Sequence, residues 1–457
     1  MGLKSTTRLL LALSALLAAG AAHADPELTR GLLAPGEVGF LWGTRFARSP
    51  YEGGERDDDF LPTPLYESKH LRLQATRAAL KVDLGAWDTE LFVQRRHEGF
   101  ALDRVPTSMT GMAQRERSAD LGLYLGFRFR EGALWSQLTR DIAGASHGSE
   151  LRVGYRHERW WQGRLRVRPY VVAALRDSRL NNYYYGVRPE EAIAGRPAYE
   201  PGAGLDLELG VQSAYRLAQR WQLIAGLAVE RPSSSVQESP TTVDGVRPSA
   251  TLGVLYGLET DPVPHGERRP LIVRVLAGES SECGFLRIVA LSCTGRHQRD
   301  PTNIWAIEVG ETLVRGINGW PVDFAFFFGV LWHEERELQA DFWQIQGYLK
   351  TYYYGFPWSG YLRTRVGFGA GAAYAKLIPF PEARDQAERG RDTSQLLFFM
   401  DPTIDVSLGD LTRSRSLRDT WLGLGVSHRS GIFGWTSAFN NVDGGSNYIY
   451  GYLETSF

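Results

Sequence analysis

His428 and Ser430 are separated by a single residue in the segment Thr420–Ser430, where apolar residues alternate with small or polar ones. Such alternation predicts a β-strand with one apolar face. Both residues have the parity of Leu422 and Leu424, so we expect them on that apolar face. A histidine can take the proton of a serine hydroxyl and activate it as a nucleophile. A polar pair among lipid-facing side chains costs free energy unless it has a purpose or a partner.

The strand that follows is also amphipathic and ends the sequence. Ile449, Leu453 and Phe457 share one parity, and tyrosines occupy the other. An amphipathic last strand with a terminal aromatic residue resembles the closing strand of bacterial outer-membrane β-barrels. Gly (50 residues) and aromatic residues (12%) are abundant. That composition, without long apolar runs, fits strands with one lipid-facing side.

The polar faces of other strands decide which way such a barrel is oriented. Arg166 and Arg168 alternate with Leu165 and Val167, and acidic residues alternate with leucines in residues 204–215. Charges of this kind are costly inside a small dry core, whereas a polar lumen with apolar residues toward lipid tolerates them. We therefore predict an all-β transmembrane antiparallel barrel. The alternative is a secreted soluble β-protein with the opposite orientation.

Residues 1–24 have the features of a cleaved signal peptide. Lys4 and Arg8 precede the apolar run Leu9–Ala21, and Ala22–Ala24 supplies a small-x-small cleavage site. Beyond it, no apolar run approaches the ~20 residues that a membrane-spanning helix requires. The near-neutral formal charge of −1 gives no indication of nucleic acid as a partner.

The Pro-rich, charged stretch 260–270 interrupts the strand pattern and predicts a linker. It separates residues 25–259 from residues 271–457. We favour two tandem barrels, the first of about 10–12 strands and the second of about 8. The alternative is one large barrel of about 18–20 strands.

Cys283 and Cys293 are the only cysteines. In an exported chain they predict a structural disulfide, with two free thiols as the alternative. No sequence motif predicts a metal site, a phosphate-binding loop or a dinucleotide fold, so we expect neither a metal nor a cofactor.

Three stretches of the first half resemble the MipA/OmpV family of outer-membrane proteins. They are Ser49–Glu67, Asn181–Gly204 and Tyr215–Gly226, and the middle one is the most specific. The resemblance covers residues 26–260 and implies an outer-membrane barrel without a catalytic motif. For the family's namesake it implies a scaffold that links a lytic transglycosylase to a peptidoglycan synthase.

The second half resembles, more weakly, the lipid A 3-O-deacylase (PagL-like) family. That family has a His-x-Ser on its next-to-last strand, matched here by His428-Arg429-Ser430, and an acidic residue on its last strand. Asn447 stands at the acidic position, so the resemblance implies a weakened serine hydrolase with His428, Ser430 and Asn447 as catalytic residues. The alternative is a polar patch at the level of the lipid headgroups.

We expect a protein of the Gram-negative outer membrane, in contact with its lipids and lipopolysaccharide. The favoured function is a non-enzymatic scaffold or structural protein whose partners include periplasmic peptidoglycan-remodelling enzymes. The alternatives are a lipid A or phospholipid hydrolase in the C-terminal half and a small-solute channel.

Overall fold

A computed structural model gives the fold of the chain as two compact units, one ending at Leu258 and one formed by the residues that follow. The predicted signal peptide, and all of residues 260–270 except the last, lie outside the residues that the structure describes. The described residues are 26–34, 37–54, 59–68, 70–74, 76–100, 106–258, 270–391, 393–431 and 444–457.

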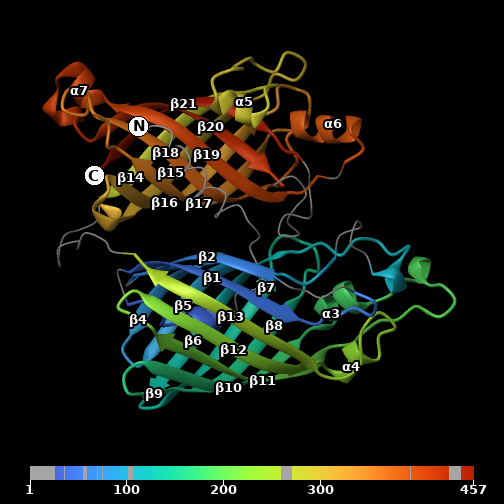
Figure 1. The fold of residues 1–457 in the computed structure, drawn as a ribbon. Helices are drawn as coiled ribbons and strands as arrows, with labels where there is room; N and C mark the ends of the chain where they lie inside the picture. Colours follow the sequence, from blue (N-terminus) through green and yellow to red (C-terminus); the bar gives the residue numbers. More distant parts are fainter. Residues whose placement is uncertain are drawn as a thin grey trace. The chain divides into compact units, whose positions relative to one another are not determined.

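The first unit is a closed antiparallel barrel of twelve strands (Figure 1). β13 pairs with β1 to close the ring, and the three-residue β9 extends the pairing of β10. The strands are β1 (Val38–Ala47), β2 (Asp59–Glu67), β3 (Leu71–Gln74), β4 (Arg77–Leu84), β5 (Trp87–Arg95), β6 (Ala119–Phe129), β7 (Gly132–Asp141), β8 (Ser149–His157), β9 (Arg159–Trp161), β10 (Leu165–Arg176), β11 (Gly204–Arg216), β12 (Trp221–Arg231) and β13 (Arg247–Gly257). Its short helices are α2 (Pro26–Thr29), η2 (Thr107–Met109), α3 (Ser178–Tyr185), η3 (Pro189–Glu191) and α4 (Ser234–Gln237).

The second unit is a closed antiparallel barrel of eight strands, in which β21 pairs with β14. The strands are β14 (Leu271–Ser280), β15 (Asn303–Val314), β16 (Val322–Glu334), β17 (Phe342–Tyr353), β18 (Thr364–Ala375), β19 (Leu396–Ser407), β20 (Thr420–Ser430) and β21 (Asn447–Ser456). Its helices are α5 (Phe285–Val289), η4 (Ile317–Gly319), α6 (Phe380–Glu388), α7 (Leu408–Thr412) and η5 (Arg415–Leu417). The prediction of two tandem barrels is confirmed, and the alternative of one large barrel is wrong.

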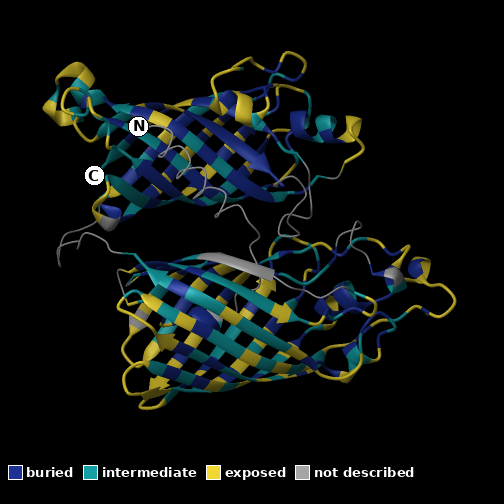
Figure 2. Cartoon of the chain, in the orientation of Figure 1, coloured by how far each residue is buried: buried dark blue, intermediate teal, exposed yellow. Residues whose placement is uncertain are grey.

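Strand alternation produces the outer surface of each barrel. On β6, Leu123 is 58% exposed, whereas its neighbour Tyr124 is 2% exposed and points into the lumen. Figure 2 shows the resulting alternation of exposed and buried residues along the strands of the first barrel. An outward band of leucine and valine is the lipid-facing surface expected of a membrane barrel. The helices in the described ranges are all too short or too polar to cross a membrane.

The two ends of the first barrel differ in the length of their connections. At the short-turn end, two residues suffice between β4 and β5, and also between β6 and β7. At the opposite end, the loop end, β10 and β11 are joined by residues 177–203. Short turns face the periplasm in barrels of this kind, and long loops face outward. In the second barrel we use loop end for the end that contains α5 and α6.

Candidate functional site

The predicted pair His428 and Ser430 lies at the loop end of β20, on the side that faces away from the lumen. Leu422 and Leu424, earlier on the same side, are 44% and 63% exposed, whereas His428 and Ser430 are 8% and 7% exposed. Strand parity therefore predicted the side correctly. The expectation that the two side chains meet lipid directly is wrong, because protein covers them.

The cover over His428 is the segment between β14 and β15. Phe285, the first residue of α5, stacks on the imidazole with ring centroids 4.4 Å apart and 18° between the planes. Cys283 and Ile288 pack with Val426 of β20. A disulfide joins Cys283 to Cys293, whose Cα atoms are 5.7 Å apart. Because this bond closes the loop that contains α5, it holds Phe285 over the histidine.

The hydrogen bonds around His428 assign it a tautomer. His428 Nδ1 lies 3.2 Å from the carbonyl oxygen of Ser446. A carbonyl only accepts, so Nδ1 carries the proton and Nε2 of the neutral ring is the acceptor. An imidazole in that state can act as a general base. Asn447 is the cross-strand partner of His428, and its Nδ2 donates to the carbonyl oxygen of Cys283 at 3.1 Å.

The lumen of the second barrel is filled by its own charged side chains. Arg274 is fully buried at their centre and contacts Glu308 at 3.2 Å, Asp401 at 3.1 Å and Glu454 at 2.7 Å. The remaining contacts are Lys350 with Asp401, Arg365 with Asp405 and Glu454, and the hydroxyls of Tyr348, Tyr352, Tyr450 and Tyr452 with these carboxylates. An eight-stranded barrel is just wide enough for side chains to fill it, and here charge pairing lets them be polar.

The loop end of the second barrel is closed by α6. Glu382 of α6 accepts a hydrogen bond from Ser446 Oγ at 3.0 Å and lies 3.8 Å from Arg429 of β20. Glu335, in the loop after β16, accepts a hydrogen bond from the backbone N–H of Phe380 at 2.9 Å. Burial raises the pKa of the Glu382 carboxyl and outweighs the lowering by Arg429. These contacts attach the helix to the barrel rim.

The short-turn end of the first barrel is closed by the chain's own N-terminal segment, residues 26–33, which we name the plug. Leu28 and Leu32 of the plug are buried. They pack against inward residues of five strands, namely Leu41, Leu65, Ala214, Ile224 and Leu255. Its sequence has no strand alternation, and we did not predict it as part of the barrel.

Charged side chains connect the plug to the lumen wall. Arg30 lies 2.9 Å from Asp88 and 2.8 Å from Glu90, both on β5. Glu27 of the plug pairs with Arg156 of β8. Arg30 also lies over the ring of Tyr124, 3.9 Å from its centroid.

The main chain of the plug is bound as well. Three donors on β10 and β12 reach its carbonyl oxygens: Arg168 Nη1 binds Arg30 O at 2.9 Å, Arg166 Nη1 binds Gly31 O at 2.5 Å and Gln222 Nε2 binds Leu32 O at 3.1 Å. The signal that points to the plug was present in the sequence. Inward arginines on a strand need hydrogen-bond acceptors. On β11, the residues opposite Arg166 and Arg168 are Ala214 and Gln212, which offer too few.

The loop end of the first barrel is covered by an aromatic cluster, which we name the loop cap. It consists of Tyr51, Phe100, Met109, Met112, Leu180, Tyr184, Tyr185, Val187 and Val236. Arg115 and Glu191 form a buried ion pair at 2.6 Å beside it. Burial acts to raise the pKa of Glu191, but hydrogen bonds from Arg115 and from backbone N–H groups outweigh it and lower the pKa to about 2. Across the described chain, no group of three or more His, Cys, Asp or Glu side chains is arranged to hold a metal ion.

The family of the first barrel follows from its sequence, and part of the matching sequence builds the loop cap. Tyr51 and Asn181–Gly204, which carried the resemblance, supply much of the loop cap. Residues 41–258 match the family described as MltA-interacting protein MipA. The first barrel belongs to the MipA/OmpV type. The match ends before the second barrel, so it gives no support to a lipid A deacylase there.

Three relatives of this MipA/OmpV barrel agree with its location. Outer membrane protein Omp26La of Vibrio anguillarum is 32% identical over 133 residues, which are 29% of this chain and 51% of that protein. OmpV of Vibrio cholerae is 31% identical over 133 residues, with the same shares. The MltA-interacting protein of Escherichia coli is 24% identical over 260 residues, 54% of this chain and 97% of that protein. The chain thus spans about half the length of Omp26La and OmpV, and it is an outer-membrane β-barrel protein.

Proposed function

We propose that the protein is a non-enzymatic scaffold of the outer membrane that binds a periplasmic peptidoglycan-remodelling enzyme through the short-turn end of its MipA/OmpV barrel. The observation that carries this proposal is the filling of both lumens. The plug and the loop cap close the first barrel, and the network around Arg274 fills the second. A barrel filled in this way offers surfaces rather than a passage.

The choice of partner follows from the relatives. One of them is named for its interaction with MltA and is matched over 97% of its length. The short-turn end faces the periplasm, where such an enzyme would be met. A partner at that end would contact the hairpin turns, including the exposed Glu131 between β6 and β7.

The test is a pull-down of the lytic transglycosylase with the purified full chain. We expect enrichment over an unrelated outer-membrane barrel, and a loss of enrichment in the charge reversal Glu131→Arg. Glu190→Arg at the loop end is the matched control and should bind as the unchanged protein does. Enrichment no greater than that of the unrelated barrel would sink the scaffold role.

The channel alternative is tested by conductance in planar bilayers. The filled lumens predict no steady conductance from the full chain. Stable ohmic steps would contradict the closed-barrel interpretation, and would show that the plug leaves the lumen under these conditions.

A second candidate function is acyl-ester hydrolysis at His428 and Ser430. The observation in its favour is the tautomer of His428, whose Nε2 is the acceptor nitrogen, together with Ser430 two residues along on the same side of the strand. In that reaction Ser430 Oγ attacks the acyl carbonyl, His428 takes the proton and returns it to the departing alcohol, and water releases the acid. The position of α5 requires that the cover lift before a lipid enters.

Mass spectrometry of lipid A and phospholipids tests this second candidate. Cells with the protein, without it, and with Ser430→Ala are compared. Loss of an acyl chain that depends on Ser430 would establish hydrolysis. Identical lipids in all three would leave the pair as a structural feature under the cover.

A further inference from the structure

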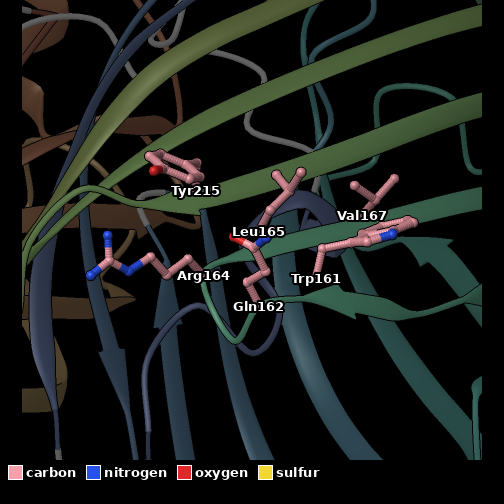
Figure 3. A pocket seen from close by; sticks show the side chains of 6 residues that line it. All are labelled: Trp161, Gln162, Arg164, Leu165, Val167 and Tyr215. Atoms are coloured by element: carbon pink, nitrogen blue, oxygen red, sulfur yellow. The ribbon is translucent and has the colours of Figure 1, made fainter.

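A pocket of about 500 Å³ lies at the short-turn end of the first barrel, around the hairpin that joins β9 to β10 (Figure 3). Its lining residues are Trp161, Gln162, Arg164, Leu165, Val167 and Tyr215. Gln162 and Gly163 have φ angles of 49° and 64°, so the chain reverses within a tight turn. The backbone N–H of Arg164 closes the turn on the carbonyl oxygen of Trp161 at 3.0 Å. The two ends of the hairpin are therefore held in fixed positions on the pocket rim.

The pocket faces the membrane and not the lumen. Arg166 and Arg168 of β10 point inward, since they bind the carbonyl oxygens of the plug. Their neighbours Leu165 and Val167 therefore point outward. Tyr215, opposite Leu165 on β11, is 39% exposed. The pocket is thus a depression in the lipid-facing surface.

Exposed aromatic residues place this depression at the edge of the bilayer. Trp87, Trp161, Trp221 and Tyr215 are all more than a third exposed, and all lie within a few residues of a short turn. Tryptophan and tyrosine gather at both interfaces of a membrane barrel. Because the short turns face the periplasm, this belt marks the headgroup level of the inner, periplasmic leaflet.

The pocket is polar at one end and apolar at the other. Figure 3 shows the guanidinium of Arg164 on one side of Leu165, and the Trp161 indole and Val167 on the other. Arg164 belongs to the turn, whereas Val167 lies three residues farther along β10, toward the middle of the barrel. The cation therefore lies toward the periplasm and the apolar wall toward the bilayer interior. A phospholipid in the periplasmic leaflet likewise has its phosphate toward the periplasm and its acyl chains toward the bilayer interior.

We propose that this pocket binds one glycerophospholipid of the periplasmic leaflet, with its phosphate on Arg164 and an acyl chain along Leu165, Val167 and Trp161. The charge of the pocket is complementary to that of a phosphate, because the lining contains one cation and no carboxylate. In the described part of the chain, Arg164 takes part in no ion pair, and its side chain is exposed. A guanidinium can bind two phosphate oxygens at once. The apolar wall is continuous with the lipid-facing surface of β10 and β11.

Native mass spectrometry of the full chain in detergent tests this proposal. Delipidated protein is mixed with phosphatidylglycerol or phosphatidylethanolamine at an equimolar ratio, and the fraction with one bound lipid is measured. We expect Arg164→Gln to lower that fraction at least fivefold, and Trp161→Ala to lower it by a smaller factor. Arg130→Gln, an exposed arginine of another short turn that does not line the pocket, should leave it unchanged.

Each alternative outcome has a defined meaning. Equal binding by Arg164→Gln and Arg130→Gln would overturn the proposal. It would also be overturned if the unchanged protein kept no bound lipid in the detergent. Binding of lipopolysaccharide but not of phospholipid by the delipidated protein would also overturn the proposal, because lipopolysaccharide belongs to the opposite leaflet. Far-ultraviolet circular dichroism of each variant verifies that the barrel is folded before binding is compared.

Discussion

The two barrels differ in where each one holds an accessory segment. The first has its accessory segment, the plug, inside the lumen, where Arg30 joins the charges of β5. The second has its accessory segment, the loop with α5, on the outside, where Phe285 covers His428. The lumen of the second is filled by side chains alone, around Arg274. The first lumen is therefore occupied by main chain and side chains together, and the second by side chains alone.

The strand number explains the difference. Barrel diameter grows roughly in proportion to the number of strands, and eight strands leave space only for side chains. Twelve strands leave space that side chains cannot fill, so a stretch of main chain occupies it. We therefore expect the removal of one charge to lower the free energy of unfolding more in the narrow lumen than in the wide one.

The largest effect should come from Arg274→Met in the narrow lumen. The change leaves the buried carboxylate of Glu308 without a cation and leaves Glu454 with Arg365 alone, at a cost of about 3–5 kcal/mol in the free energy of unfolding. Urea unfolding in micelles, followed by tryptophan fluorescence, measures it. Arg299→Gln, at an exposed ion pair with Glu388, should change stability by less than about 0.5 kcal/mol. Equal effects of the two changes would contradict the central role of Arg274.

Removing the disulfide tests the outer accessory segment. The double change Cys283→Ser and Cys293→Ser frees a short loop, for which the chain-entropy account predicts a loss of about 2–3 kcal/mol. Phe285 should then leave His428 more often. The rate of His428 modification by diethyl pyrocarbonate should rise, and reduction of the unchanged protein should reproduce the increase. An unreactive histidine in both cases would mean that packing alone holds the cover.

Arg30→Met in the plug should have a smaller effect than Arg274→Met. Glu90 keeps its contact with Arg77 at 2.8 Å and a second contact with Arg72, and Glu27 keeps Arg156. Asp88 loses its cation, but its side chain is 17% exposed and can be solvated in part. We expect a loss of about 1–2 kcal/mol in the same unfolding experiment. A loss as large as that of Arg274→Met would show that the two lumens respond alike, and would break the comparison.

The last prediction concerns the loop cap. Its effect is absent at neutral pH and appears only in acid. The pKa of Glu191 is lowered to about 2 in the folded protein, so its stabilising contribution is complete above the ordinary carboxyl pKa near 4.5 and is lost as pH falls toward 2. Opening of residues 178–203 should rise up to about tenfold per pH unit across that window. Hydrogen exchange of this segment measures it, and Glu191→Gln should remove the dependence. A flat profile in the unchanged protein would contradict the assigned ion pair.

Strand periodicity predicted the barrels well, because it reflects a local property of the chain. The parity of Leu422 and Leu424 correctly indicated the outward side of β20, and the charges at Arg166 and Arg168 correctly indicated a polar lumen. The covering of His428 and the insertion of the plug were missed. Both depend on contacts between residues far apart in the chain, such as Phe285 with His428 and Arg30 with Glu90. Alternation along one strand can show that inward arginines need acceptors, but it contains no information about which distant segment supplies the contacts.

The candidate site was predicted only in part. His428 and Asn447 are neighbours across the β20–β21 ladder, as counting along the two strands suggested. The carbonyl oxygen of Ser446 accepts a hydrogen bond from the imidazole, and the side chain of Asn447 interacts with the same ring. A backbone acceptor has no signature in a sequence, so this part of the geometry required the fold.

The lumen arginines of the first barrel hold the plug largely by its main chain. Arg166, Arg168 and Gln222 bind carbonyl oxygens, which every residue type possesses. Over evolutionary time, the plug residues other than Glu27, Leu28, Arg30 and Leu32 can therefore change while the seal persists, and mutational scanning should find Arg166 and Arg168 less tolerant of change than those plug residues.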